Sequence, residues 1–143
     1  MTLSKSLLAA ALCLAVATPA MARNITVTPE RVPAYWQVTN TSVDIDVPNS
    51  ARNTSGPGCA AVAYTIDGNG NVSQPVAKKV VPAGDFATIA VSAVSRFHYA
   101  AVRGTNDNWQ PIDTYYVVQF NMPTDPAAKA ALLKQCELPG YAS

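Results

Sequence analysis

The fold of this chain is decided by the stretch DFATIAVSAVSRFHY, residues 85–99. Its apolar residues recur at helical spacing and form one stripe: Phe86, Ile89, Ala90, Ala93, Val94 and Phe97. This spacing predicts a helix of about four turns with one buried face, and it places Phe97 in the core. Asp85 stands just before the stripe, where its carboxylate can accept hydrogen bonds from the free N–H groups of the first turn. We therefore expect Asp85 to be the N-cap.

On either side of this helix the apolar period changes to two, which predicts strands over about 59–67, 72–81 and 113–122. The residues 68–71, Gly-Asn-Gly-Asn, predict a hairpin turn because they accept positive φ at little cost. Pro75 places the second strand at a sheet edge or at a bulge. Asp125 and Pro126 begin a second helix. The predicted fold class is α+β: a small antiparallel sheet of ββαβ order, one packed helix and an additional C-terminal helix.

The first 22 residues have the features of a cleavable signal peptide. Lys5 is followed by an apolar run over 7–16 and by Ala20-Met21-Ala22, a small-residue cleavage site. The run of about ten apolar residues is too short to span a bilayer. We therefore expect a bacterial protein of the periplasm or the medium, without a membrane span after signal removal. The remaining chain divides into an N-terminal extension with short strands (23–47), a main domain (48–123), and a C-terminal helix and tail (124–143).

Charge and cysteine content restrict the partners. Of 10 basic and 9 acidic residues, Lys5 is lost with the signal peptide, so the exported chain has no net charge. Such a chain lacks the basic surface of a nucleic-acid-binding protein, and protein or peptide partners are expected. Of the 3 cysteines, Cys59 and Cys136 remain. In an oxidising compartment an even pair predicts a disulfide, the alternative being two separate buried thiols.

The sequence offers little for catalysis or metal binding. His98 is the single histidine, and no Gly-x-Ser-x-Gly motif presents a nucleophile. The segment 67–71 begins like a calcium loop, but Val72 and Lys78 stand where that loop needs Gly and Glu. We expect no enzyme activity, no cofactor and no metal site.

The order of motifs resembles the C-terminal domain of TonB, a periplasmic receptor-binding module of energy-transducing proteins. The resemblance covers about residues 48–123. It rests on these positions in order: Pro48, Ala51, Gly58, Ile66-Asp67, Gly70, Ile89-Ala90-Val91, Arg96-Phe97, Pro111-Ile112 and Val118-Gln119-Phe120. The chain departs from the family in its cleavable signal peptide, in lacking a Pro-rich spacer, and in having Cys59 where the family usually has no cysteine.

The resemblance implies that the sheet edge takes up an extended peptide from an outer-membrane receptor by strand addition. The candidate peptide-binding edge is the last strand with the loop before it: Tyr115, Val117, Gln119, Asn121 and Trp109. That strand is apolar on both faces. Either other segments of the protein cover both faces, or one face is free to bind a partner. Trp109 is an aromatic hot-spot candidate, the alternative being that it covers the end of the helix.

Two functions follow. The first is a periplasmic protein-binding domain linked to receptor-mediated transmembrane transport through its sheet edge. The alternative is a structural or stress-related envelope protein that is not energy-transducing, in which the N-terminal extension or the C-terminal helix blocks the edge. A homodimer is left open. Because the chain has no membrane anchor after signal removal, we do not expect it to transduce energy by itself.

Overall fold

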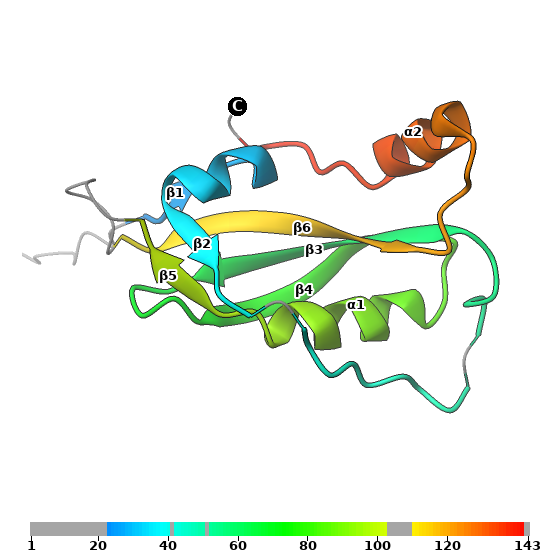
Figure 1. The fold of residues 1–143 in the computed structure, drawn as a ribbon, viewed down its shortest axis with the longest axis horizontal. Helices are drawn as coiled ribbons and strands as arrows, with labels where there is room; N and C mark the ends of the chain where they lie inside the picture. The colour runs from blue at the N-terminus through cyan, green and yellow to red at the C-terminus, as the bar shows by residue number, and fades with distance from the viewer. Residues whose placement is uncertain (1–22, 41, 51, 103–109, 142–143) are drawn as a thin grey trace, which may run out of the picture.

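The computed structural model describes residues 23–40, 42–50, 52–102 and 110–141. The fold is α+β, as predicted, and is built on a four-stranded sheet of order β1-β6-β3-β4 (Figure 1). The central strand β3 (Gly58–Ile66) pairs antiparallel with β4 (Val72–Val81) on one side and with β6 (Ile112–Phe120) on the other. A strand of two residues, β1 (Ile25–Thr26), joins the other side of β6 in parallel.

The sheet has a helix on each face (Figure 1). Helix α1 (Phe86–Ser95) buries its apolar stripe against the even-numbered side chains of β3. Phe86 is 1% exposed and stacks on Phe120 with 4.1 Å between ring centroids. Helix α2 (Pro126–Gln135) lies on the opposite face, and the Asp125 carboxylate caps it by accepting from Ala128 N at 2.8 Å. No helix within the described residues has the length and apolar character needed to cross a membrane.

The N-terminal extension is part of this fold. Beyond β1 the chain forms a 3₁₀ helix, η1 (Pro29–Ala34), and then β2 (Trp36–Val38). Strand β2 pairs antiparallel with β5 (Tyr99–Ala101) in a second, two-stranded sheet. The Asp113 carboxylate accepts from Asn24 Nδ2 at 2.9 Å, which fixes β1 beside β6. Within this extension, residues 43–47 alternate between apolar residues and aspartate, but they form no strand.

The helix is shorter than its apolar stripe suggested. It ends at Ser95, and Phe97 is half-buried beyond it. The Asn40 side chain binds the backbone at this point: its Nδ2 donates to Arg96 O at 2.6 Å, and its Oδ1 accepts from His98 N at 2.9 Å. The next residues then pair with β2. Long-range contacts with the N-terminal extension thus override local helical periodicity.

Asp85 occupies the N-cap position, but its side chain makes no capping hydrogen bond. Its carboxylate instead accepts from the hydroxyl of Ser50 and from the backbone N–H of Arg52 at 2.7 Å. The Arg52 guanidinium lies 3.6 Å away. A tertiary bond to the loop before β3 has replaced the expected local cap.

The hairpin between β3 and β4 sits against β5. Gly70 has φ +83°, and a Cβ atom added there would lie 2.0 Å from the carbonyl oxygen of Tyr99. The Gly70 carbonyl accepts from Tyr99 N at 2.8 Å. Glycine is required at this position because the backbone conformation is left-handed and the neighbouring chain comes so close.

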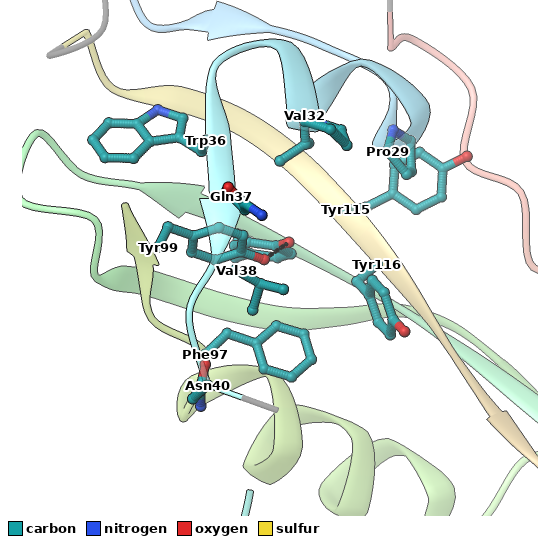
Figure 2. A pocket seen from close by; sticks show the side chains of 12 residues that line it. Pro29, Val32, Trp36, Gln37, Val38, Asn40, Phe97, Tyr99, Tyr115 and Tyr116 are labelled. Carbon is teal, nitrogen blue, oxygen red and sulfur yellow. Dashed lines mark hydrogen bonds between the residues drawn. The ribbon is translucent and has the colours of Figure 1, made fainter. Parts of the chain in front are cut away.

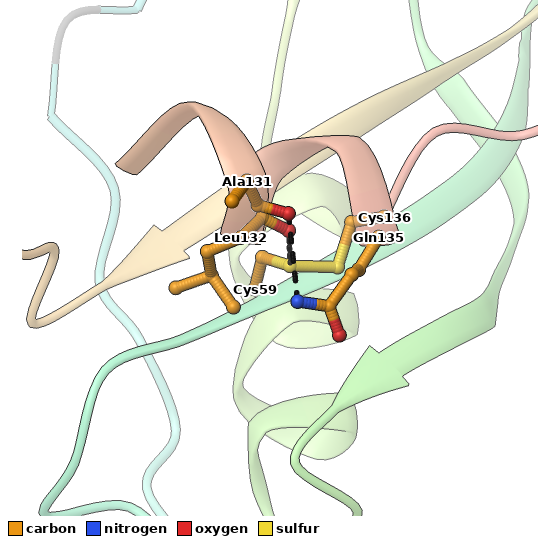
Figure 3. Close-up of a disulfide and its surroundings, with 5 residues drawn as sticks. All are labelled: Cys59, Ala131, Leu132, Gln135 and Cys136. Atoms are coloured by element: carbon orange, nitrogen blue, oxygen red, sulfur yellow. Dashed lines mark hydrogen bonds between the residues drawn. A yellow bond between two sulfur atoms is a disulfide. The ribbon is translucent and has the colours of Figure 1, made fainter. Parts of the chain in front are cut away.

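A disulfide joins Cys59 of β3 to Cys136 at the end of α2, as predicted (Figure 3). Both cysteines are fully buried, and the Cys59 sulfur lies 3.4 Å from the carbonyl oxygen of Leu132. Helix α2 itself has no buried residue. The disulfide, together with Leu132, Leu138 and Tyr141, therefore holds the C-terminal segment on the sheet.

Candidate functional site

The outer edge of β6 carries backbone groups that face away from the sheet. The carbonyl oxygen of Asp113 accepts from Val27 N at 3.0 Å, so Asp113 directs its backbone outward, away from β3. Backbone direction alternates along a strand. The N–H and C=O groups of Tyr115, Val117 and Gln119 therefore also point to the outer edge, while those of the residues between them pair with β3.

Pro29 ends the pairing of β1 with β6. If the parallel ladder continued, the backbone nitrogen of residue 29 would donate to the carbonyl of Tyr115, in step with the bond from Val27 to Asp113. Proline has no N–H to donate. The chain turns instead into η1 at this residue. Beyond Asp113, no backbone within the described ranges pairs with the outer edge of β6.

The opposite edge of the sheet, at β4, has features that oppose strand addition. It carries Pro75, the adjacent Lys78 and Lys79, and two register shifts against β3. Gln74 has φ +52°, a conformation that interrupts a regular strand. Prolines, lysines and bulges are the devices by which sheets avoid pairing with other chains. Residues 115–120 of β6, by contrast, contain no proline and no charged residue.

The outer edge of β6 is open over part of its length. Tyr115 is 8% exposed, because Tyr141 packs on its ring with 4.8 Å between centroids. Val117 is half-buried beside the C-terminal segment, and Gln119 is exposed. The outward-facing backbone of Val117 and Gln119 thus remains for an added strand, to which it offers two N–H and two C=O groups.

A cavity of about 630 Å³ lies beside this edge (Figure 2). The N-terminal extension forms one wall and the sheet with its flanking aromatic residues forms the other. The cavity is lined by Pro29, Val32, Pro33, Trp36, Gln37, Val38, Asn40, Tyr64, Phe97, Tyr99, Tyr115 and Tyr116. None of these side chains is charged.

The aromatic walls of the cavity are ordered by contacts among themselves. The hydroxyls of Tyr64 and Tyr99 lie 2.7 Å apart in a hydrogen bond. Phe97 meets Tyr116 edge to face, with 5.3 Å between ring centroids, and the two side chains lie next to each other in Figure 2. Burial raises the pKa of both Tyr64 and Tyr99 above the usual tyrosine value. These tyrosines stay neutral, so the cavity presents ring surfaces and no charge.

The other predicted site residues lie in different settings. Asn121 follows the end of β6 with φ +45°, and its Nδ2 donates to the carbonyls of Thr54 and Gly56 at 3.0 Å each. Asn121 therefore orders the loop before β3. Trp109 lies outside the described residues. His98 is exposed, and its Nδ1 lies 3.3 Å from the Asn71 side-chain oxygen. The described part of the chain contains no group of three His, Cys, Asp or Glu side chains suited to a metal ion.

The cavity could not be predicted from the sequence. Tyr64 lies in a segment that predicts a strand, whereas Phe97 and Tyr99 lie at the end of the segment that predicts a helix, and no local pattern brings them together with β2. One signal was present, because Tyr116 and Val118 made the second face of the last strand apolar. Tyr116 is 45% exposed, since α1 packs over β4 and β3 and leaves this part of β6 uncovered.

The arrangement of helix α1 on the β3–β4–β6 sheet can be compared with solved structures. The chain is similar to the solution structure of the TonB C-terminal domain of Pseudomonas aeruginosa, with a TM-score of 0.50 and 14% sequence identity. The fold is TonB C-terminal-like. The match covers 70% of this chain and 97% of that domain. No protein-family model and no curated protein sequence matches the chain.

Proposed function

We propose that this protein is a periplasmic binding module that takes up an extended peptide at the outer edge of β6 by strand addition. The observation that carries the proposal is the contrast between the two edges of one sheet. The β4 edge has proline, lysines and bulges, whereas the outward backbone groups of Val117 and Gln119 have none of these beside them. In strand addition, main-chain hydrogen bonds supply affinity and adjacent pockets supply side-chain specificity.

The candidate partners are the periplasmic N-terminal segments of outer-membrane receptors, which the TonB-like fold favours. The chain would act by binding, without catalysis and without transducing energy by itself. Extended, uncharged peptide segments fit an edge of this kind, since residues 115–120 offer backbone groups and uncharged side chains only.

One observation favours the second candidate, a structural envelope protein with a closed edge. The C-terminal segment packs on the Tyr115 and Val117 side chains through Tyr141 and Leu138. This segment covers part of one face of β6, next to the edge that would receive the strand. The two functions therefore differ in whether the remaining edge at Val117 and Gln119 accepts a strand in the cell.

A crosslinking experiment decides between them. A photoreactive residue is placed at Gln119 and, as a matched control, at Val76, which is 48% exposed on the β4 edge. The protein is irradiated in its own cell envelope, and the adducts are identified by mass spectrometry. We expect receptor N-terminal segments on Gln119 and not on Val76. A folded, disulfide-bonded protein with no adduct at either position would reject strand addition in favour of the structural role.

A backbone variant tests the mode of binding. Gln119→Pro removes one outward N–H without removing a bond to β3, whereas Gln119→Thr changes the side chain and keeps the N–H. Gln119→Pro is expected to lose binding of the crosslinked peptide, and Gln119→Thr to keep it. Equal binding by both variants would show that the peptide does not pair with this edge.

A further inference from the structure

We infer that the cavity between the N-terminal extension and β6 receives an aromatic side chain of the added strand. That a strand is added at this edge rests on the proposed function. That its side chain is aromatic rests on the shape and chemistry of the cavity. The aromatic residue would be the anchor that gives the edge its sequence preference, because backbone pairing alone does not distinguish one extended peptide from another.

The position of the cavity connects it to the edge. Pro29, where pairing to β6 stops, and the β6 residues Tyr115 and Tyr116 all line it. A residue paired across from Val118, within the open part of the edge, directs its side chain to the same face as Val118 and Tyr116. Diagonal neighbours on that face are within reach of long aromatic side chains. Such a side chain would lean across Tyr116 toward Phe97 and Val38, which Figure 2 shows together at the cavity.

The chemistry of the walls selects against charged occupants. No lining residue is charged, so an entering carboxylate or ammonium group would lose water without gaining an oppositely charged partner. Several polar groups in the walls are already engaged. The hydroxyls of Tyr64 and Tyr99 bond to each other, and both ends of the Asn40 amide bond to backbone. An apolar side chain therefore fits this surface better than a polar one.

Ring geometry favours an aromatic occupant over an aliphatic one. The edge-to-face contact of Phe97 with Tyr116, at 5.3 Å between centroids, leaves ring surface facing the cavity. A further ring can join such a pair in offset or edge-to-face contact, which adds to the gain from burial alone. The cavity volume of about 630 Å³ lies within the range of sites that bind small groups.

The test separates the cavity from the edge. Side-chain NMR shifts of Phe97, Tyr99 and Tyr116 are followed while the purified protein is titrated with N-acetyl-phenylalaninamide, N-acetyl-alaninamide or N-acetyl-glutamate amide. Only the phenylalanine compound is expected to shift these residues in a saturable way. Val38→Asp, on the cavity wall and 47% exposed in the native protein, should weaken that binding by about tenfold or more. Val76→Asp, on the β4 edge, is the matched control and should leave it unchanged.

A second arm uses strand peptides of the form acetyl-Thr-Val-Thr-Xaa-Thr-Val-Thr-amide, with Xaa as Phe, Ala or Glu. The Phe peptide should bind about tenfold tighter than the Ala peptide, and Val38→Asp should abolish the difference. The inference is overturned by an absence of saturable shifts with the phenylalanine compound. It is also overturned by equal binding of the glutamate compound, or by cavity shifts that appear on raising the protein concentration alone, which would place a second copy there. If Gln119→Pro leaves peptide binding unchanged while the phenylalanine compound still binds, strand addition fails and the aromatic preference stands.

Discussion

At the scale of single residues, Asp85 shows how a tertiary contact can replace a local one. Its carboxylate binds the loop before β3 through the Ser50 hydroxyl and the Arg52 N–H, while the first turn of α1 receives no side-chain cap. These hydrogen bonds, that of Ser50 foremost, lower the pKa of Asp85 below the usual aspartate value. The residue type at the N-cap was predictable from the sequence. Its partner was not, because Ser50 lies 35 positions away.

This lowered pKa predicts a loss of stability in acid. A carboxyl group whose pKa is lower in the folded than in the unfolded state stabilises the fold above the unfolded pKa, which is about 3.9. That contribution disappears as the pH falls through the folded pKa. Ser50→Ala removes the largest cause of the shift, so we expect the variant to melt lower than the native protein at neutral pH and to lose less stability on acidification. Thermal melts of the two proteins, recorded from neutral pH into the acid range, measure the stability at neutral pH and its loss in acid. If the melting temperatures of the two proteins fell in parallel with pH, the Ser50 hydrogen bond would not be the main cause of the lowered Asp85 pKa.

The two phenylalanines at the ends of the α1 stripe differ in burial. Phe86 is 1% exposed and stacks on Phe120, whereas Phe97 is half-buried at the cavity. We expect Phe86→Ala to lower the free energy of unfolding by about 3–5 kcal/mol, and Phe97→Ala by clearly less. Urea unfolding of both variants makes the comparison. A larger loss for Phe97→Ala would mean that the core is centred on the cavity and not between α1 and the sheet.

At the scale of elements, the strands and helices with their own periodicity were predictable. The strands β3, β4 and β6 and both helices lie where the apolar pattern placed them, within a few residues. The elements that were missed, η1 and β5, are short and depend on partners distant in the chain. Strand β5 pairs with β2 and also bonds to Gly70 of the hairpin, and the predicted helix is shortened because its last residues take part in these contacts. A pattern within one segment carries no information about such partners.

Helix α2 depends on the disulfide more than on its own packing. It has no buried residue, and the Cys59–Cys136 bond closes a sequence separation of 77 residues. We expect the double variant Cys59→Ser and Cys136→Ser to lower the free energy of unfolding by about 2–5 kcal/mol. Hydrogen exchange should accelerate over 126–141 and stay slow in β3. Uniform acceleration through the sheet would show instead that the disulfide supports the whole core.

At the scale of the whole molecule, the uncharged edge and cavity predict that binding is insensitive to salt. Neither residues 115–120 nor the cavity walls contain a charged side chain. Electrostatic steering is screened by salt, whereas backbone pairing and apolar burial are not. Peptide affinity should change little between low salt and roughly 0.5 M salt, measured by calorimetry. A steep loss of affinity would indicate that charged groups outside this site hold the peptide.

The candidate site was predictable in part. Alternation along the last strand identified Tyr115, Val117 and Gln119 as one set, and their backbone groups do face the outer edge. The strand order could not be read from the chain, so neither the termination of β1 at Pro29 nor the cavity beside it could be foreseen. The exact placement of the C-terminal segment on Tyr115 likewise follows from three-dimensional packing and from the disulfide.

The unequal edges of the sheet also set the stoichiometry of any strand-paired assembly. A sheet with two receptive edges can grow without limit, as in cross-β fibrils, because each added strand exposes a new edge to the next molecule. In this protein the second edge of the sheet is β4, where Pro75, Lys78 and the register shifts oppose pairing with another molecule. Growth from chain to chain is thus terminated after one addition. Under the proposed strand addition, the protein would hold one strand at the outer edge of β6 and remain a discrete complex instead of a polymer.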